Sequence, residues 1–261
     1  MTKIQVGVQL APQHTSYEAY AKVVREVEAL GVDTIWNWDH FFPPWDYPNH
    51  GDHFEAWTLL TAMATLTHRA KIGCLVTCNN YRNPALLSNM AKTVDHISGG
   101  RLILGLGAGW FEAEYHEYSY KFETAPERLK ELETSLSIIK QRWEVDMPQP
   151  VQGKIPLLIG GDGEHFTLRL AAQYADMWNS GAKPKDYKHK CEVLDSWCEK
   201  VERRPSEIER TLNIYGEPTM ATYDDYVEAG AQHIILNVGS PWSLTSVEQL
   251  ILWRDSRQTS L

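Results

Sequence analysis

The sequence lacks any apolar run that approaches the roughly 20 residues of a membrane-spanning helix. It also lacks a secretory signal pattern, since Met1, Thr2 and Lys3 lead directly into a strand-like apolar segment. Cysteine is scarce: only four occur among 261 residues, and their spacing matches neither a zinc array nor a disulfide framework. These absences predict a cytoplasmic protein with reduced thiols and no membrane partner.

Excess positive charge is absent as well. Lys and Arg number 25 against 34 Asp and Glu, which gives a formal net charge of −9. Nucleic acids are bound through clustered Lys and Arg, and no such cluster is seen, so the composition argues against a nucleic-acid partner. An anionic ligand must therefore be held by a few local groups.

A convincing metal-ligand pattern is missing too. His50, Asp52 and His53 lie close together, but they fall in a loop flanked by proline and glycine. Metal-dependent barrel hydrolases commonly take closely spaced histidine ligands from a strand, with further ligands from other strands. The sequence predicts no metal, and we expect this loop to pack over the mouth of the fold.

Strand-like and helix-like patterns alternate along the chain. The capping boxes Thr15-x-x-Glu18 and Thr124-x-x-Glu127 predict two helix starts, and Gly31 predicts a helix end. The predicted strands are Ile4–Leu10, Asp33–Asp39, Lys71–Thr77, Arg101–Gly107, Pro156–Ile159, Asp176–Asn179, Glu209–Ile214 and Gln232–Val238. Eight strand and helix pairs close naturally into one TIM (β/α)8 barrel domain over residues 1–261. An open, doubly wound sheet is the alternative.

The segment Arg101–Tyr115 carries the densest signal, an apolar strand that runs into Gly105, Gly107 and Gly109. Glycine exposes backbone at the end of a buried strand, where a flat ligand can lie against it. A dinucleotide fingerprint is the alternative, but Trp110 and Phe111 follow at once and no small-residue helix opens on the glycines. We interpret the segment as the floor of a cofactor site.

His40 is the leading candidate for proton transfer. It follows the second predicted strand, beside Asp39 and ahead of an aromatic stretch that would exclude water. The plainer interpretation is that His40 only bonds Asp39 or a loop carbonyl. Trp36, Trp38, Trp45 and Trp110 suggest an apolar, aromatic pocket, although such residues also pack as ordinary core.

Two further strand exits are candidates for binding. Thr77, Cys78 and Asn79 form a polar exit where a backbone bulge could support a planar cofactor, or where the chain is a plain loop; Cys78 as a nucleophile lacks an evident base. Gly160, Gly161 and Gly163 precede a predicted helix over Thr167–Tyr174, an arrangement that presents N–H groups to a phosphate, with Lys183 or Arg82 for charge. A tight turn that needs glycine is the alternative.

Taken together, these segments resemble the luciferase-like monooxygenase family and, within it, the branch of deazaflavin (coenzyme F420)-dependent oxidoreductases. The resemblance covers most of the chain and rests on Asp33–Phe41, Gly73–Pro84, Asp95–Trp110 and Gly160–Gly163. It implies that Asp39 and His40 flank the reactive edge of the deazaflavin. It assigns the cofactor to Thr77, Cys78 and Asn79 as a bulge behind the ring, often with a non-proline cis peptide, to Gly107, Gly109 and Trp110 alongside, and to Gly160, Gly161, Gly163 and Asn179 at its phosphate or tail.

The sequence departs from the family in two places. Some relatives place a Glu directly after the glycines, whereas this chain has Trp110, with Glu112 and Glu114 later. The C-terminal half is also shorter, because Ile214 leads almost directly to the helix at Tyr223. The site is therefore expected to be more open, or to be completed by another subunit in a homodimer.

The resemblance implies hydride transfer between a bound deazaflavin and a small organic substrate, with His40 as proton donor or acceptor and Asp39 tuning its orientation. Two alternatives stay open. Reduced FMN in the same fold would make the protein a monooxygenase, and a degenerate member would bind a flavin without turnover.

Overall fold

A computed structural model describes residues 4–49 and 51–258. Its strands are β1 Gln5–Leu10, β2 Thr34–Asn37, β3 Lys71–Cys74, β4 Thr77–Cys78, β5 Leu102–Gly107, β6 Leu157–Gly160, β7 Met177–Ser180, β8 Glu209–Ile214 and β9 His233–Val238. All pair in parallel, in the order β3-β2-β1-β9-β8-β7-β6-β5-β4, and β3 also pairs with β5. That last pairing closes the sheet, so the predicted TIM barrel is confirmed and the open sheet is wrong.

The third strand of the barrel is broken in two. β3 ends at Cys74 and β4 begins at Thr77, and both parts pair with β5. The peptide bond between Leu75 and Val76 in the gap is cis, although neither residue is proline. The prediction of one continuous strand over Lys71–Thr77 was therefore wrong. The interruption lies at Leu75 and Val76, just ahead of the exit that the sequence had indicated.

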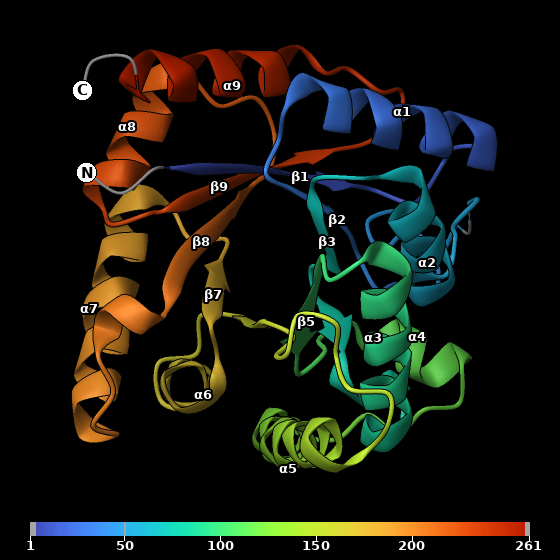
Figure 1. Cartoon of the computed structure of the whole chain (residues 1–261), viewed down its shortest axis with the longest axis vertical. Helices are drawn as coiled ribbons and strands as arrows, with labels where there is room; N and C mark the ends of the chain where they lie inside the picture. Colours follow the sequence, from blue (N-terminus) through green and yellow to red (C-terminus); the bar gives the residue numbers. More distant parts are fainter. Residues whose placement is uncertain (1–3, 50, 259–261) are drawn as a thin grey trace.

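Helices surround the barrel (Figure 1). They are α1 Tyr17–Leu30, α2 Ala56–Leu66, α3 Pro84–Ser98, α4 Glu112–Glu117, α5 Ala125–Val145, α6 Thr167–Tyr174, α7 Pro184–Lys200, α8 Met220–Glu228 and α9 Thr245–Gln258. α4 was not predicted from the sequence. In the described part of the chain, no helix combines the length and the apolar character that a membrane crossing needs.

The helix ends show which local signals act. α1 begins one residue later than its predicted box, because Ser16 is the cap and its hydroxyl accepts from the N–H of Ala19. Gly31 ends the helix with φ of 96°, a left-handed conformation that glycine adopts without strain. At the start of α5 the box is present: Glu127 accepts from both the N–H and the hydroxyl of Thr124.

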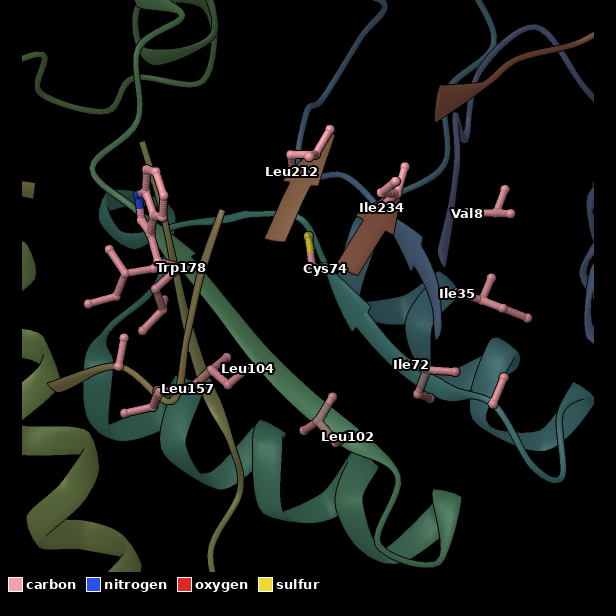
Figure 2. Close-up of a cluster of buried hydrophobic side chains, with 14 of the residues drawn as sticks. Val8, Ile35, Ile72, Cys74, Leu102, Leu104, Leu157, Trp178, Leu212 and Ile234 are labelled. Atoms are coloured by element: carbon pink, nitrogen blue, oxygen red, sulfur yellow. The ribbon is translucent and has the colours of Figure 1, made fainter. Parts of the chain in front are cut away.

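The main core lies between the strands and the surrounding helices. Figure 2 shows part of it, including Val8, Ile35, Ile72, Leu104 and Leu157. A smaller cluster is separate and comprises Trp36, Leu75, Ile103, Leu158, Met177 and Ile235, with Val76 packed against it. Alternate residues of a strand point to opposite faces, so neighbours such as Ile35 and Trp36 serve different cores. Trp36 is fully buried and is a core residue, not part of a pocket wall.

Polar side chains join the amino ends of four strands. His233 bonds Glu209 at 2.9 Å and Thr34 at 2.9 Å, Gln5 donates to Glu209, and Trp36 donates to Thr34. Each of Gln5, Thr34, Glu209 and His233 is the first residue of its strand. These hydrogen bonds cross-link β1, β2, β8 and β9 at their amino ends.

Candidate active site

A cavity of about 550 Å³ opens at the carboxyl ends of the strands. This volume lies within the roughly 300–1,000 Å³ typical of small-molecule and cofactor sites. Its lining includes Gln9, Trp38, Asp39, His40, Trp45, Leu75, Val76, Cys78, Gly107, Gly109, Trp110, Arg128, Gly160, Gly161, Thr167, Asn179, Asn213 and Tyr215. The strand exits that the sequence singled out therefore converge on one space.

His40 is oriented by Glu114, a fully buried carboxylate on α4. His40 Nδ1 lies 2.8 Å from Glu114 Oε2, and the same carboxylate accepts from Tyr81 Oη at 2.8 Å and from the N–H of Phe41 at 2.5 Å. A carboxylate only accepts, so the hydrogen of the neutral imidazole sits on Nδ1. Within the described part of the chain Nε2 has no partner, which leaves it for a ligand in the cavity.

Asp39 does not orient His40, contrary to the expectation from sequence. Arg82 donates to both Asp39 oxygens, at 2.6 and 2.9 Å, and the N–H of Cys78 donates to Asp39 at 2.9 Å. Burial opposes the charge of Arg82, but Asp39 and Glu55 raise the pKa of its guanidinium above the usual value. Asp39 lines the cavity as half of a closed ion pair that ties the exit of β2 to β4. For the same reason Arg82 is not free to pair with a phosphate.

The glycine pattern makes room for Val76. A Cβ atom at Gly107 would lie 2.7 Å from Val76 Cγ2, and one at Gly160 would lie 2.8 Å from Val76 Cγ1. At Gly105 an added Cβ would collide with the carbonyl oxygen of Cys74. The glycines of β5 and β6 thus leave the space that the break in the third strand occupies. Val76, which lies in that break, lines the cavity. This close approach is the physical reason for a pattern that sequence reasoning interpreted as a cofactor floor.

A buried amide network holds the bulge at Leu75. Gln9 Nε2 donates to the carbonyl oxygen of Leu75 at 2.5 Å. Gln9 Oε1 in turn accepts from Asn213 Nδ2 at 2.6 Å and from Asn237 Nδ2 at 3.0 Å. Side chains from β1, β8 and β9 therefore fix a carbonyl in the opposite wall of the barrel. Sequence reasoning did not find these residues, because a lone amide inside an apolar strand gives no indication of its partner.

Gly109 and the thiol of Cys78 both lie close to the hydroxyl of Tyr115. Gly109 has φ of 74°, and a Cβ there would collide with Tyr115 Oη and lie 2.7 Å from Cys78 Sγ. Burial raises the pKa of the Cys78 thiol to about 12, so the thiol stays neutral near pH 7. Cys78 has the environment of a packing residue and not of a nucleophile, and all four cysteines are buried and free.

Arg128 is a buried cation without a counterion. It lies in the first turn of α5, is 8% exposed, and forms no ion pair among the described residues. Its guanidinium donates to the carbonyl of Glu123 and lies 4.2 Å from the ring centroid of Phe122, while its Nε has no hydrogen-bond partner in the part of the chain described. A buried charge without an opposite charge is costly, so this group fits an anionic ligand in the cavity.

Part of the predicted phosphate segment also lines the cavity. Gly160 and Gly161 line it, together with Thr167 at the start of α6 and Asn179, whose amide donates to Thr211 at 2.8 Å. Gly163 is not among the described lining residues; a Cβ there would lie 2.9 Å from Thr167 Oγ1. Asp162 and Glu164 are the two acids of this segment: Glu164 is paired with Lys190 at 2.5 Å, whereas Asp162 Oδ1 has no hydrogen-bond partner among the described residues. Lys183 is exposed at the cap of α7.

Two residues of the predicted bulge do not line the main cavity. Thr77 is fully buried in β4, and Asn79 lines a second cavity with Asn80 and Arg82; neither is among the described residues around the main cavity. Of the loop considered for metal binding, His50 lies outside the described residues. Among those described, no group of three His, Cys, Asp or Glu side chains is placed to hold a metal ion.

The comparisons with known proteins decide the family. The family model described as luciferase-like monooxygenase matches residues 1–249. The chain belongs to this family. It is 28% identical over 144 residues to "F420-dependent glucose-6-phosphate dehydrogenase" of Amycolatopsis mediterranei, which covers 55% of this chain and 43% of that protein. It is 27% identical over 208 residues to "5,10-methylenetetrahydromethanopterin reductase" of Archaeoglobus fulgidus, covering 74% of this chain and 58% of that protein.

The alignments therefore span about half the length of these curated relatives. Among solved structures, an "F420-dependent secondary alcohol dehydrogenase in complex with an F420-acetone adduct" matches with a TM-score of 0.86 at 17% identity, over 97% of this chain and 99% of that one. This likeness shows a shared fold.

The structure of this luciferase-like chain also shows where the residue after the glycines lies and which of the two later glutamates reaches His40. Trp110 occupies the position after the glycines and lines the cavity, and Glu114, one turn further on, supplies the buried carboxylate behind His40. Glu112 is exposed and pairs with His116 instead. The sequence named both acids but could not choose between them, because α4 itself was not predicted.

Proposed function

We propose that this luciferase-like protein is a deazaflavin (coenzyme F420)-dependent oxidoreductase that transfers a hydride between the cofactor and a small organic substrate. Two features of the cavity carry the proposal together. An imidazole held by a buried carboxylate faces the space, and a buried arginine that has no counterion among the described residues lines it too. The similarity to F420-dependent relatives supports the choice of cofactor.

The residues around the cavity fit an elongated cofactor with a flat ring and an anionic tail. Arg128 would pair with the anionic group, and Thr167 at the start of α6 and the backbone of Gly160 and Gly161 also line the cavity. Val76 and Leu75, held by Gln9, would support one face of the ring. When bound, a deazaflavin carries two electrons and one hydrogen as a hydride, so the matching proton must be handled by the protein.

His40 is suited to that proton. Glu114 keeps the hydrogen on Nδ1 and stabilises the imidazolium, so Nε2 can take a proton from a substrate hydroxyl or return one to a carbonyl oxygen. Tyr81 and Phe41 satisfy the remaining positions of the carboxylate, which keeps it from turning away. Asp39 would act on the site through Arg82 and the N–H of Cys78, as a positioning residue.

The test is a titration of the purified protein with F420 and with FMN, each followed by the fluorescence of the cofactor. We expect tight binding of F420, and turnover of a secondary alcohol or ketone from a small panel. His40→Ala should leave the Kd for F420 nearly unchanged and lower hydride transfer by on the order of a hundredfold. Tighter binding of FMN with oxygen consumption would instead favour a monooxygenase. Equal rates for wild type and His40→Ala would remove His40 from the mechanism.

Assembly as a homodimer also stays a proposal. Residues 215–219 lead directly from β8 to α8, and Tyr215 lies more than half exposed at the cavity. A short connection of this kind leaves the mouth open enough for a second copy to cover it. Sedimentation of the loaded protein at several concentrations measures this, and a monomer throughout would contradict it.

A further inference from the structure

Three large aromatic rings stand at the mouth of the cavity, around His40. Trp45 is 62% exposed, Trp110 61% and Tyr215 55%. The ring centroid of Trp45 lies 6.2 Å from that of Trp110 and 6.4 Å from that of Tyr215. His40 lies 6.4 Å from Trp45 and 5.8 Å from Trp110, measured between ring centroids. These rings contact one another, and all four side chains line the cavity.

Packing alone does not account for this cluster. The three residues follow β2, β5 and β8, so three separate loops bring them together. One face of Trp45 is covered by Trp38, with centroids 5.7 Å apart and planes at 23°. Trp45, Trp110 and Tyr215 are nevertheless each more than half exposed to solvent. Contiguous exposed apolar surface beside a cavity is typical of a binding site for an apolar ligand.

The two buried acids at this mouth already have hydrogen-bond partners. Asp39 is paired with Arg82, and Glu114 with His40, Tyr81 and the N–H of Phe41. Among the described residues that line the cavity, Arg128 is the one arginine or lysine, and it belongs to the first turn of α5. An anionic group placed among Trp45, Trp110 and Tyr215 would thus lose water without gaining a cation as its partner, whereas the faces of the aromatic rings do not disfavour a cation in this way.

We propose that the substrate is a small compound without negative charge, with an apolar, ring-sized body and one hydroxyl or carbonyl oxygen. Its body lies among Trp45, Trp110 and Tyr215, and its oxygen points to His40 Nε2. Trp110, which the resemblance assigned to the cofactor, is thereby assigned to the substrate side. This proposal rests on the proposed function for the identity of the reaction, but it concerns a binding preference that can be measured without turnover.

The experiment compares two probes of nearly equal shape, acetophenone and para-acetylbenzoate. Binding to the F420-loaded protein, and to the protein alone, is followed by calorimetry and by quenching of tryptophan fluorescence. We expect acetophenone to bind at least roughly tenfold more tightly than para-acetylbenzoate, because a desolvated carboxylate without a cationic partner is penalised. Equal or tighter binding of para-acetylbenzoate overturns the proposal.

Substitutions locate the site. Trp45→Ala and Tyr215→Ala should each weaken acetophenone binding by roughly tenfold, as loss of an aromatic contact at a binding surface does. Tyr17→Ala is the matched control, since Tyr17 is an exposed tyrosine on α1, outside the described lining of the cavity. Unchanged affinity in Trp45→Ala and Tyr215→Ala contradicts the proposal, provided that their circular dichroism and Tm match the wild type.

The two proposals fail in different ways. If F420 does not bind, the proposed function is wrong, while the preference for acetophenone over para-acetylbenzoate is still measured on the protein alone. If F420 binds and para-acetylbenzoate binds as tightly as acetophenone, the substrate class is wrong and the cofactor assignment stands.

Discussion

Nδ1 of His40 lies 2.8 Å from Oε2 of Glu114, and this contact joins the loop after β2 to the short helix α4. Glu114 is fully buried and makes two more hydrogen bonds, so its position is determined by the fold and not by solvent. The contact decides which nitrogen of His40 faces the cavity.

Replacing Glu114 by Gln should lower kcat by roughly 10- to 100-fold, because the imidazolium loses its buried counter-charge. The Kd for F420 should change little, since Glu114 is not among the described residues that line the cavity; a loss of packing would weaken F420 binding as well. Glu112→Gln is the control, because Glu112 is exposed on the same helix. A variant with wild-type kcat would show that Glu114 does not position His40.

The fit between Gly107 and Val76 is open to a test by double substitution. Gly107→Ala places a Cβ 2.7 Å from Val76 Cγ2 and should lower the free energy of unfolding by about 1–3 kcal/mol. Val76→Ala removes that γ carbon, so the double variant should recover most of the loss. Gly181→Ala, where nothing lies within 4 Å of an added Cβ, should have little effect. Urea unfolding measures all four variants; strict additivity would rule out the direct clash.

Arg128 gives opposite predictions for binding and for stability. Arg128→Met should raise the Kd for F420 by roughly 10- to 100-fold, because a charge-assisted contact to the anionic tail is lost. The Tm of the cofactor-free protein should stay the same or rise, because a buried cation without a counterion is removed. Arg142→Met, an exposed site on the same helix, is the control. Loss of Tm together with an unchanged Kd would mark Arg128 as a structural residue.

His53 should make the protein less stable in mild acid. Burial, with repulsion from His40, lowers the pKa of His53 from 6.5 to about 4, and Trp38 donates to its Nε2 at 3.1 Å. Between pH 6.5 and about pH 4, His53 binds a proton in the unfolded chain but not in the folded protein. The free energy of unfolding therefore falls as the pH drops from 6.5 towards 4. The loss is on the order of 3 kcal/mol.

His53→Gln keeps an acceptor for Trp38 and removes this titration. The free energy of unfolding, measured by urea at several pH values, should therefore depend less on pH in the variant across that window. Parallel curves for wild type and variant would show that His53 is not the source of the acid sensitivity.

The order of strands and helices was readable from the sequence, because periodicity and caps are local properties. Segments such as Arg101–Gly107 and Gln232–Val238 carry their strand pattern within themselves, and Gly31 ends α1 wherever that helix lies. Eight alternating strand and helix pairs are compatible with few topologies, so the barrel could be predicted from the sequence. Parallel strands place their ends on one rim, and that rule was enough to name His40, Cys78, Gly107 and Gly160 as neighbours.

What the sequence alone determined about this protein is thus its barrel, its family and the strand ends that meet at one cavity. The tertiary structure decided the partners: Glu114 and not Asp39 behind His40, Arg82 on Asp39, Gln9 on the carbonyl of Leu75, and Arg128 left without a counterion. These contacts join residues that are far apart in the chain. Local pattern specifies only which elements form, whereas the pairing of charges and amides depends on distances set when all the elements have packed.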